Sequence, residues 1–132
     1  RLVDWFGGIT VVLSPQSVDV YNTKTIQATM GSILRVPVFQ AEANFLEQIK
    51  SKGFEVYGAD MTGDSIYKTT YAERSVIVIG SESHGMSEQI RAACKKLVSI
   101  PNMEGDQKVE SLNAASSTGI VLAELKRKVS IG

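Results

Sequence analysis

Short segments rich in β-branched residues alternate along this chain with segments whose apolar residues have helical spacing. The strand-like segments cover residues 9–14, 34–39, 54–60, 75–80 and 96–101. The helical patterns cover residues 23–32, 41–53, 86–96 and 111–128. Continuous apolar runs are typical of strands buried on both faces, and regular alternation with helices implies parallel pairing. We therefore predict an α/β fold with a mostly parallel sheet flanked by helices, in which ligands collect beyond the carboxyl ends of the strands.

Two further features bear on the organisation of the chain. Gly53 directly follows a helical pattern and predicts the end of that helix. Residues 58–75 form the longest polar stretch, and we expect them to make turns rather than a domain boundary. With 132 residues and no internal repeat, the chain is expected to form one domain over residues 1–132.

Composition excludes several classes of protein. Lys plus Arg and Asp plus Glu balance at 14 each, so no strong overall field draws the chain toward nucleic acid. The single cysteine, Cys94, allows no intrachain disulfide, which predicts a reducing compartment and a cytoplasmic protein. Its helical context indicates a small packed residue rather than a catalytic thiol. No apolar run approaches the roughly 18 residues of a membrane span.

The stretch VIVIGSESHGMSEQI, residues 76–90, is the first candidate site. The spacing from Gly80 to Gly85 is one residue too long for the Gly-x-Ser-x-Gly elbow of hydrolases, and a phosphate loop would need Lys after its last glycine. His84 is the only histidine, so neither a hydrolase triad nor a zinc site is indicated, and no metal is expected. The local pattern leaves a structural turn and a ligand-binding loop as open alternatives.

Three ordered motifs together carry a family resemblance. The chain opens with RLVDWFGG, continues through VIGSESHGMS, and ends with SIPNMEGDQKVESLNAASSTGI. These segments resemble the motifs of the SpoU/TrmH-type RNA ribose 2′-O-methyltransferases of the SPOUT class. The matching positions are Arg1, Phe6 and Gly7, then Gly80, Glu82 and Gly85, then Ile100, Pro101, Ser111, Leu112 and Asn113.

The resemblance implies a SPOUT-type α/β knot, in which the C-terminal segment is threaded into a trefoil knot. It also implies S-adenosylmethionine (SAM) as cofactor, with Gly80, Ile100 and Leu112 at the cofactor-binding positions. A glycine such as Gly80 would let the backbone approach the adenosine closely. Apolar side chains at positions 100 and 112 could sandwich the adenine.

The resemblance likewise assigns catalytic positions. Arg1 matches the arginine that activates the ribose hydroxyl, and an always-protonated guanidinium is expected to position and polarise rather than act as a simple base. Glu82 is expected to orient Arg1 through a charge-assisted hydrogen bond. Ser111 and Asn113 carry groups suited to holding RNA phosphate, ribose or a neighbouring loop.

Each of these positions also has a structural interpretation. Ser111 could be the N-cap of the last helix, Asn113 an exposed residue of its first turn, and Glu82 a solvated loop acid. His84 is interpreted as a variable loop residue rather than a catalyst.

Four residues near the N-terminus have open roles. Trp5 and Phe6 are expected to pack in the core rather than stack on bases. Lys24 and Arg35 could contact RNA, or they could be a solvated lysine and an ordinary strand-flanking arginine.

The resemblance is incomplete at the N-terminus. The first motif of the family begins with an asparagine that precedes the position of Arg1, so we expect the chain to belong to a longer protein whose first strand and start of motif one are missing here. No separate RNA-recognition domain is recognised, and the loop from Asn102 to Glu110 is longer than is usual in the family.

The function predicted from the resemblance is SAM-dependent methylation of a ribose 2′-hydroxyl in tRNA or rRNA. The resemblance also implies a homodimer formed through the knotted region, and no association with a membrane is expected. Two alternatives stay open. One is a non-catalytic RNA-binding or dimerisation module with the same fold, and the other is a doubly wound nucleotide-binding domain.

Overall fold

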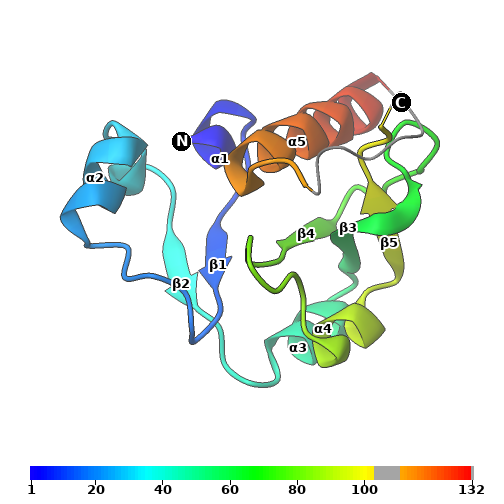
Figure 1. Ribbon diagram of the computed structural model, residues 1–132, viewed down its shortest axis with the longest axis horizontal. Coiled ribbons are helices and arrows are strands. Elements are labelled where there is room, and N and C mark those ends of the chain that lie inside the picture. Colours follow the sequence, from blue (N-terminus) through cyan, green and yellow to red (C-terminus); the bar gives the residue numbers. More distant parts are fainter. Residues whose placement is uncertain (103–110, 132) are drawn as a thin grey trace. The chain divides into compact units, whose positions relative to one another are not determined.

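The computed structural model describes residues 1–102 and 111–131, which divide into two compact units, Arg1–Phe45 and Leu46–Gly132 (Figure 1). Each unit contains a parallel sheet, so the predicted α/β class and parallel pairing are confirmed. The predicted long loop from Asn102 to Glu110 lies, apart from Asn102, outside the described residues. The C-terminal knot and the single domain therefore stay predictions.

The first unit has two strands and three short helices. They are α1 (Leu2–Trp5), β1 (Val11–Leu13), α2 (Thr23–Thr29), the 3-10 helix η1 (Ser32–Leu34) and β2 (Val38–Gln40). The two strands pair in parallel, with Val11 opposite Val38. The predicted strand at 34–39 therefore begins later than expected. Pro37 lacks a backbone donor for a sheet, and its carbonyl accepts hydrogen bonds from Val11 N and from Thr10 Oγ1 just before β2 begins.

Polar contacts fix the turn that precedes β2. Arg35 donates to Asp4 Oδ2 from Nε at 2.9 Å and from Nη2 at 2.6 Å, and the buried Ser32 hydroxyl donates to the same oxygen at 2.7 Å. The hydrogen bond from Arg35, aided by that from Ser32, lowers the pKa of the Asp4 carboxyl. Arg35 thus has a structural partner in its own unit, as its interpretation as an ordinary strand-flanking residue requires.

The expectation that Trp5 packs in the core is wrong. Its side chain is 83% exposed, whereas Phe6 is partly buried. The helix α1 is only four residues long and has no buried residue, and Leu2, Val3 and Asp4 are partly buried. A Cβ at Gly8 would lie 2.6 Å from Val3 Cγ1, so the chain turns back tightly over Val3 and not over Trp5.

The second unit contains the remaining elements. They are α3 (Phe45–Ser51), which begins at the boundary, and β3 (Glu55–Ser65), β4 (Ser75–Ile79), α4 (Glu88–Ala93), β5 (Lys96–Ser99) and α5 (Ala114–Ile131). The sheet order is β4-β3-β5 with both pairings parallel, so the carboxyl ends of the three strands share one edge. Gly53, two residues after the end of α3, has φ of 82°, which confirms the predicted helix end. None of the helices within the described ranges is long and apolar enough to cross a membrane.

Helices cover both faces of this sheet, as Figure 1 shows for α5 on one side and for α3 and α4 on the other. The α5 side holds the hydrophobic core, which consists of Tyr57, Ile66, Tyr71, Val98 and Val121. The rings of Tyr57 and Tyr71 meet edge to face, with their centroids 5.0 Å apart. On the other side, a Cβ at Gly58 would lie within 3.0 Å of Met86, Cys94 and Leu97, so the α4 layer sits directly on the strand.

The two ends of α5 are both attached to loops of the second unit. Near the C-terminal end, Lys128 Nζ donates to the carbonyl oxygens of Tyr67 at 2.8 Å and of Thr69 at 2.6 Å. The N-terminal end is held by Glu82, as described below. A helix fixed at both ends keeps its first turn in place relative to the sheet edge.

Residues 58–75, predicted to make turns, instead begin with the continuation of the central strand. The pairing with β5 shifts between Ala59 and Asp64, since both are opposite Val98, so residues 60–63 are looped out of the ladder. We call residues 60–63 the β3 excursion. A Cβ at Gly63 would lie 2.4 Å from the carbonyl carbon of Leu97 and from the nitrogen of Val98. The excursion therefore returns to the sheet by direct backbone contact.

This contact predicts that Gly63→Ala destabilises the protein strongly. Overpacking costs about 1–3 kcal/mol when side chains can yield, and here the added methyl meets backbone, so we expect about 3 kcal/mol. Gly53→Ala is the control, because its Cβ would meet nothing within 4 Å and only the left-handed φ opposes it, at about 1–2 kcal/mol. Urea unfolding measures both. Equal losses for the two variants would contradict the close packing of β3 on β5.

Candidate functional site

The loop after β4 folds back on itself at the carboxyl edge of the sheet. Ser81 and Gly85 pair in both directions, with N···O distances of 3.2 and 2.9 Å, and Gly85 has φ of 67°. A Cβ at Gly80 would lie 2.4 Å from the carbonyl carbon of Gly85 and 2.6 Å from Met86 N. Position 80 therefore needs glycine for the return of its own loop, which is a different reason from the close approach to adenosine that the sequence suggested.

Glu82 joins this loop to the last helix. Its Oε1 atom accepts hydrogen bonds from Asn113 Nδ2 and from the backbone N–H of Ala114, both at 3.0 Å. A carboxylate at this position satisfies an otherwise unpaired N–H of the first helical turn and complements the helix dipole. The interpretation of Glu82 as a merely solvated acid is therefore wrong, although its side chain is exposed. The second and third sequence motifs meet at this carboxylate.

The N-cap of α5 is Asn113 and not Ser111. Asn113 Oδ1 accepts from the backbone N–H groups of Ala115 at 2.9 Å and Ser116 at 3.2 Å. Both structural interpretations of the sequence are corrected by this geometry, because Asn113 precedes the first turn and Ser111 lies further upstream. Ser111 is exposed beside the start of α5. Its predicted catalytic role stays a prediction.

The two apolar candidates differ in burial. Ile100 is partly buried and packs against the core cluster of the second unit. Leu112 is 50% exposed and lies directly before the Asn113 cap. Leu112 thus exposes apolar surface, whereas Ile100 packs inward at the end of β5, and the predicted cofactor contacts of both residues stay predictions.

Arg1 belongs to the first unit. Its Nη1 atom lies 3.1 Å from Met30 Sδ, and its side chain is exposed. Glu82 lies in the loop after β4 of the second unit, where its carboxylate contacts the start of α5. The predicted pairing of Arg1 with Glu82 stays a prediction.

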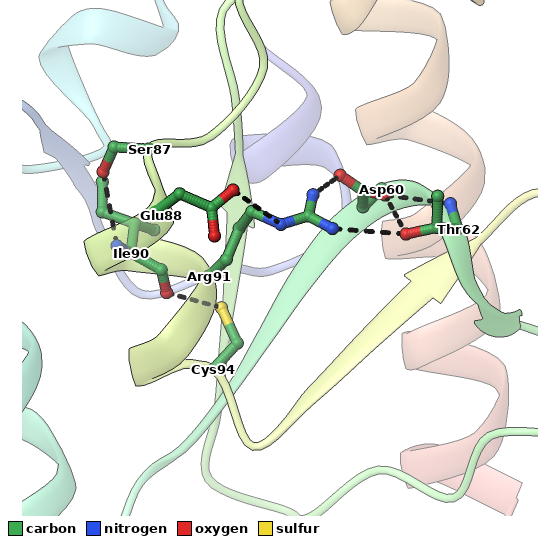
Figure 2. Close-up of polar contacts among 7 residues, drawn as sticks. All are labelled: Asp60, Thr62, Ser87, Glu88, Ile90, Arg91 and Cys94. Atoms are coloured by element: carbon green, nitrogen blue, oxygen red, sulfur yellow. Dashed lines mark hydrogen bonds and ion pairs between the residues drawn. The ribbon is translucent and has the colours of Figure 1, made fainter.

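Sequence analysis missed a polar cluster beside the loop, shown in Figure 2. Asp60 Oδ1 accepts from Thr62 N at 2.9 Å and from Thr62 Oγ1 at 2.6 Å, and Asp60 Oδ2 accepts from Arg91 Nη1. Partial burial raises the pKa of the Asp60 carboxyl, but the hydrogen bonds from Thr62 and the ion pair with Arg91 outweigh that effect and lower it overall. An Asp two residues before Thr signals a local turn, whereas no sequence pattern pairs it with a residue 31 positions later.

Cys94 has the structural role that its sequence context predicted. Its Sγ atom lies 3.3 Å from the carbonyl oxygen of Ile90, at the end of α4. Burial raises the pKa of the thiol, which disfavours the reactive thiolate.

The geometry of the α5 cap yields a testable expectation. Glu82→Ala and Asn113→Ala should each lower the free energy of unfolding by about 1 kcal/mol, as loss of an N-cap typically does. Because the two side chains share a hydrogen bond, the double variant should lose less than the sum. Glu73→Ala, at an exposed position, is the control and should change little. Strict additivity in thermal or urea unfolding would show that Glu82 and Asn113 act independently, and no loss in Glu82→Ala would show that Glu82 does not act on the cap.

Comparisons with known proteins identify relatives of this chain. Residues 1–123 match the profile of the SpoU rRNA Methylase family. An uncharacterized tRNA/rRNA methyltransferase from Archaeoglobus fulgidus is 30% identical over 130 residues, which cover 97% of this chain and 57% of that protein. The chain thus spans little more than half the length of this curated relative.

Solved structures show the same fold. A putative TrmH-family RNA methyltransferase from Porphyromonas gingivalis superposes with a TM-score of 0.86 at 33% identity, covering 97% of this chain and 52% of that one. The SpoU methyltransferase AviRb from Streptomyces viridochromogenes, in complex with AdoMet, gives 0.87 at 27% identity, covering 100% and 54%. Since the family profile matches most of its length, the chain belongs to the SpoU rRNA Methylase family.

Proposed function

We propose that this chain is the catalytic region of a SAM-dependent methyltransferase that modifies a ribose 2′-hydroxyl of tRNA or rRNA. The observation that carries the proposal is the Glu82 carboxylate, which joins the loop after β4 to the start of α5 at the carboxyl edge of a parallel sheet. Ligands of open α/β sheets bind at that edge. Family membership and the AdoMet complex of AviRb support SAM as the ligand.

The residues at this edge fit SAM in their chemistry. The paired loop from Ser81 to Gly85 offers backbone groups to a nucleoside, and Leu112 offers exposed apolar surface for an adenine ring. Glu82 and Asn113 fix the backbone that directly follows Leu112, which helps to preorganise this surface before binding. When bound, SAM supplies the methyl group as a sulfonium.

The remaining chemistry falls to the side chains that handle the ribose. A 2′-hydroxyl is a poor nucleophile while it keeps its proton, so a group must polarise the O–H bond and align the oxygen. We assign this role to Arg1, whose guanidinium stays protonated and donates to the hydroxyl oxygen or a neighbouring phosphate. A carboxylate has about four lone-pair sites, so Glu82 can orient Arg1 while it caps α5. Ser111, exposed beside that cap, would hold RNA phosphate or ribose, and Asn113 would fix the loop that presents it.

The partners follow from the same proposal. The substrate is structured RNA, recognised through unpaired nucleotides. The protein is proposed to act in the cytoplasm as a C2 homodimer through the knotted region, so that groups from both subunits reach the site.

Calorimetric titration of SAM into the full chain tests the cofactor. We expect binding near one SAM per subunit. Leu112→Ala should weaken it about fivefold to tenfold, because roughly 1 kcal/mol of apolar contact is lost. Gly80→Trp should abolish it by forcing the loop open. Glu73→Trp controls for a bulky residue elsewhere on the surface, and ATP controls for general nucleotide binding. No heat with SAM from a folded protein, or equal binding of ATP, would contradict the proposal.

Methyl transfer tests Arg1. With tRNA or rRNA as substrate, Arg1→Lys should lower kcat by about 100-fold or more, as loss of a positioned polarising group does, and leave SAM affinity unchanged. Transfer from radiolabelled SAM measures the first quantity and calorimetry the second. Lys52→Met, which removes an exposed cation before the amino end of β3, is the control. A loss confined to KM for RNA would assign Arg1 to substrate binding alone.

A further inference from the structure

The β3 excursion emerges from the middle of the site edge. Because the sheet order is β4-β3-β5, residues 60–63 leave the central strand between the Gly80–Gly85 loop, which follows β4, and Ile100, which follows β5. Any ligand that spans the edge between those two segments has the excursion beneath or beside it. Its position therefore helps to determine the shape of the pocket.

Two contacts hold the excursion from opposite sides. On the β5 side, Ser99 Oγ donates to the carbonyl oxygen of Gly63 at 2.8 Å. On the α4 side, Arg91 pairs with Asp60 and lies 3.3 Å from Thr62 Oγ1, while Asp60 closes the local turn onto Thr62 (Figure 2). The Arg91 guanidinium thus contacts both ends of that turn, Asp60 and Thr62.

Arg91 is well placed to connect the excursion with the loop after β4. It lies on α4, whose N-cap Ser87 directly follows that loop and accepts a hydrogen bond from Ile90 N at 3.3 Å. Met86, between the loop and the helix, packs on Gly58 of β3. The loop, α4 and the excursion therefore form one continuous set of contacts.

Partial burial makes the loss of one partner of this ion pair more costly than at an ordinary surface pair. The side chains of Arg91 and Asp60 are 27% and 17% exposed. Glu88 reinforces Arg91 only weakly, at 3.9 Å and with a side chain almost fully exposed. Removing one partner would leave the other charge partly buried and unpaired, which favours local rearrangement of the excursion.

We propose that Arg91 and Asp60 are positioning residues that hold the β3 excursion and the Gly80–Gly85 loop in the arrangement that binds SAM. This inference rests on the proposed function, since it concerns the same pocket. Neither residue needs to touch the cofactor. Their role is to keep two pocket segments from moving apart, so that binding does not have to order them.

A second ion pair on the same strand provides a matched control. Glu55 and Lys95 also join β3 to the segment after α4, but they lie at the amino end of the strand, away from the site edge. Breaking either pair removes one cation from the same region of the fold. Only loss of the Asp60–Arg91 pair, at the carboxyl edge of the sheet, should change the affinity for SAM.

The experiment compares SAM affinity and stability in full-chain variants. We expect Arg91→Met to weaken SAM binding about tenfold, the lower end of what outer-shell partners contribute at metal sites. Arg91→Lys should recover part of that loss, because Lys can pair with Asp60 but lacks the fork that also reaches Thr62. Asp60→Asn combined with Arg91→Met should lose no more than the single Arg91 variant. Lys95→Met should bind SAM as the unaltered protein does.

Hydrogen exchange supplies a readout independent of affinity. In Arg91→Met, the amide of Thr62 should exchange faster, whereas in Lys95→Met it should keep its protection. Equal loss of SAM affinity in both variants, or wild-type affinity in a folded Arg91→Met, would overturn the positioning role and leave the proposed function intact. Absence of SAM binding by the unaltered chain would overturn the proposed function and this inference with it.

Discussion

The parallel order β4-β3-β5 is the constraint on which the site depends. Parallel pairing places the carboxyl ends of all three strands on one edge, so segments distant in sequence must leave the sheet together. The parallel topology alone therefore places the loop after β4, the excursion from β3 and the residue after β5 at the same edge of the sheet. Two polar side chains then fix the spacing of these segments. Glu82 joins the loop after β4 to the start of α5, and Arg91 joins α4 to the β3 excursion. Topology provides the site, and these two charges give it a defined shape.

Close backbone approach explains why glycine recurs at this edge. Gly58, Gly63 and Gly80 lie on β3, in the excursion and at the start of the loop, and a Cβ at each would lie under 3.0 Å from a neighbouring atom. At Gly63 and Gly80 the neighbour is backbone, which cannot turn aside as a side chain can. These glycines therefore let neighbouring segments of this chain pack closely against one another, and this close packing does not depend on a ligand.

The sequence predicts the elements better than it predicts their contacts. Periodicity and β-branched composition locate β4, β5 and α5 because such signals are local. The same signals fail over residues 58–75, whose polar composition conceals a strand that continues to Ser65. Pairing with β5, and not hydrophobicity, maintains this part of the strand. Motif order locates Glu82 and Asn113, but their mutual hydrogen bond, which joins residues 31 positions apart, depends on the folded topology. The exposure of Trp5 likewise depends on how α1 turns, and composition cannot show that.

The two ion pairs along β3 have different structural surroundings, which indicates different roles in fold stability and in the geometry of the candidate site. Glu55 at its amino end pairs with Lys95 and accepts from the buried Tyr57 hydroxyl at 2.6 Å, which ties that pair to the hydrophobic core. Asp60, in the middle of β3 and directly after the last residue that pairs with β4, contacts a local turn and a helix that borders the site. Two carboxylates on one strand, each paired with a cation from the α4 region, can thus serve different purposes. The Glu55–Lys95 pair supports the fold, whereas the Asp60–Arg91 pair maintains the geometry of the β3 excursion, where the backbone leaves the ladder with β5.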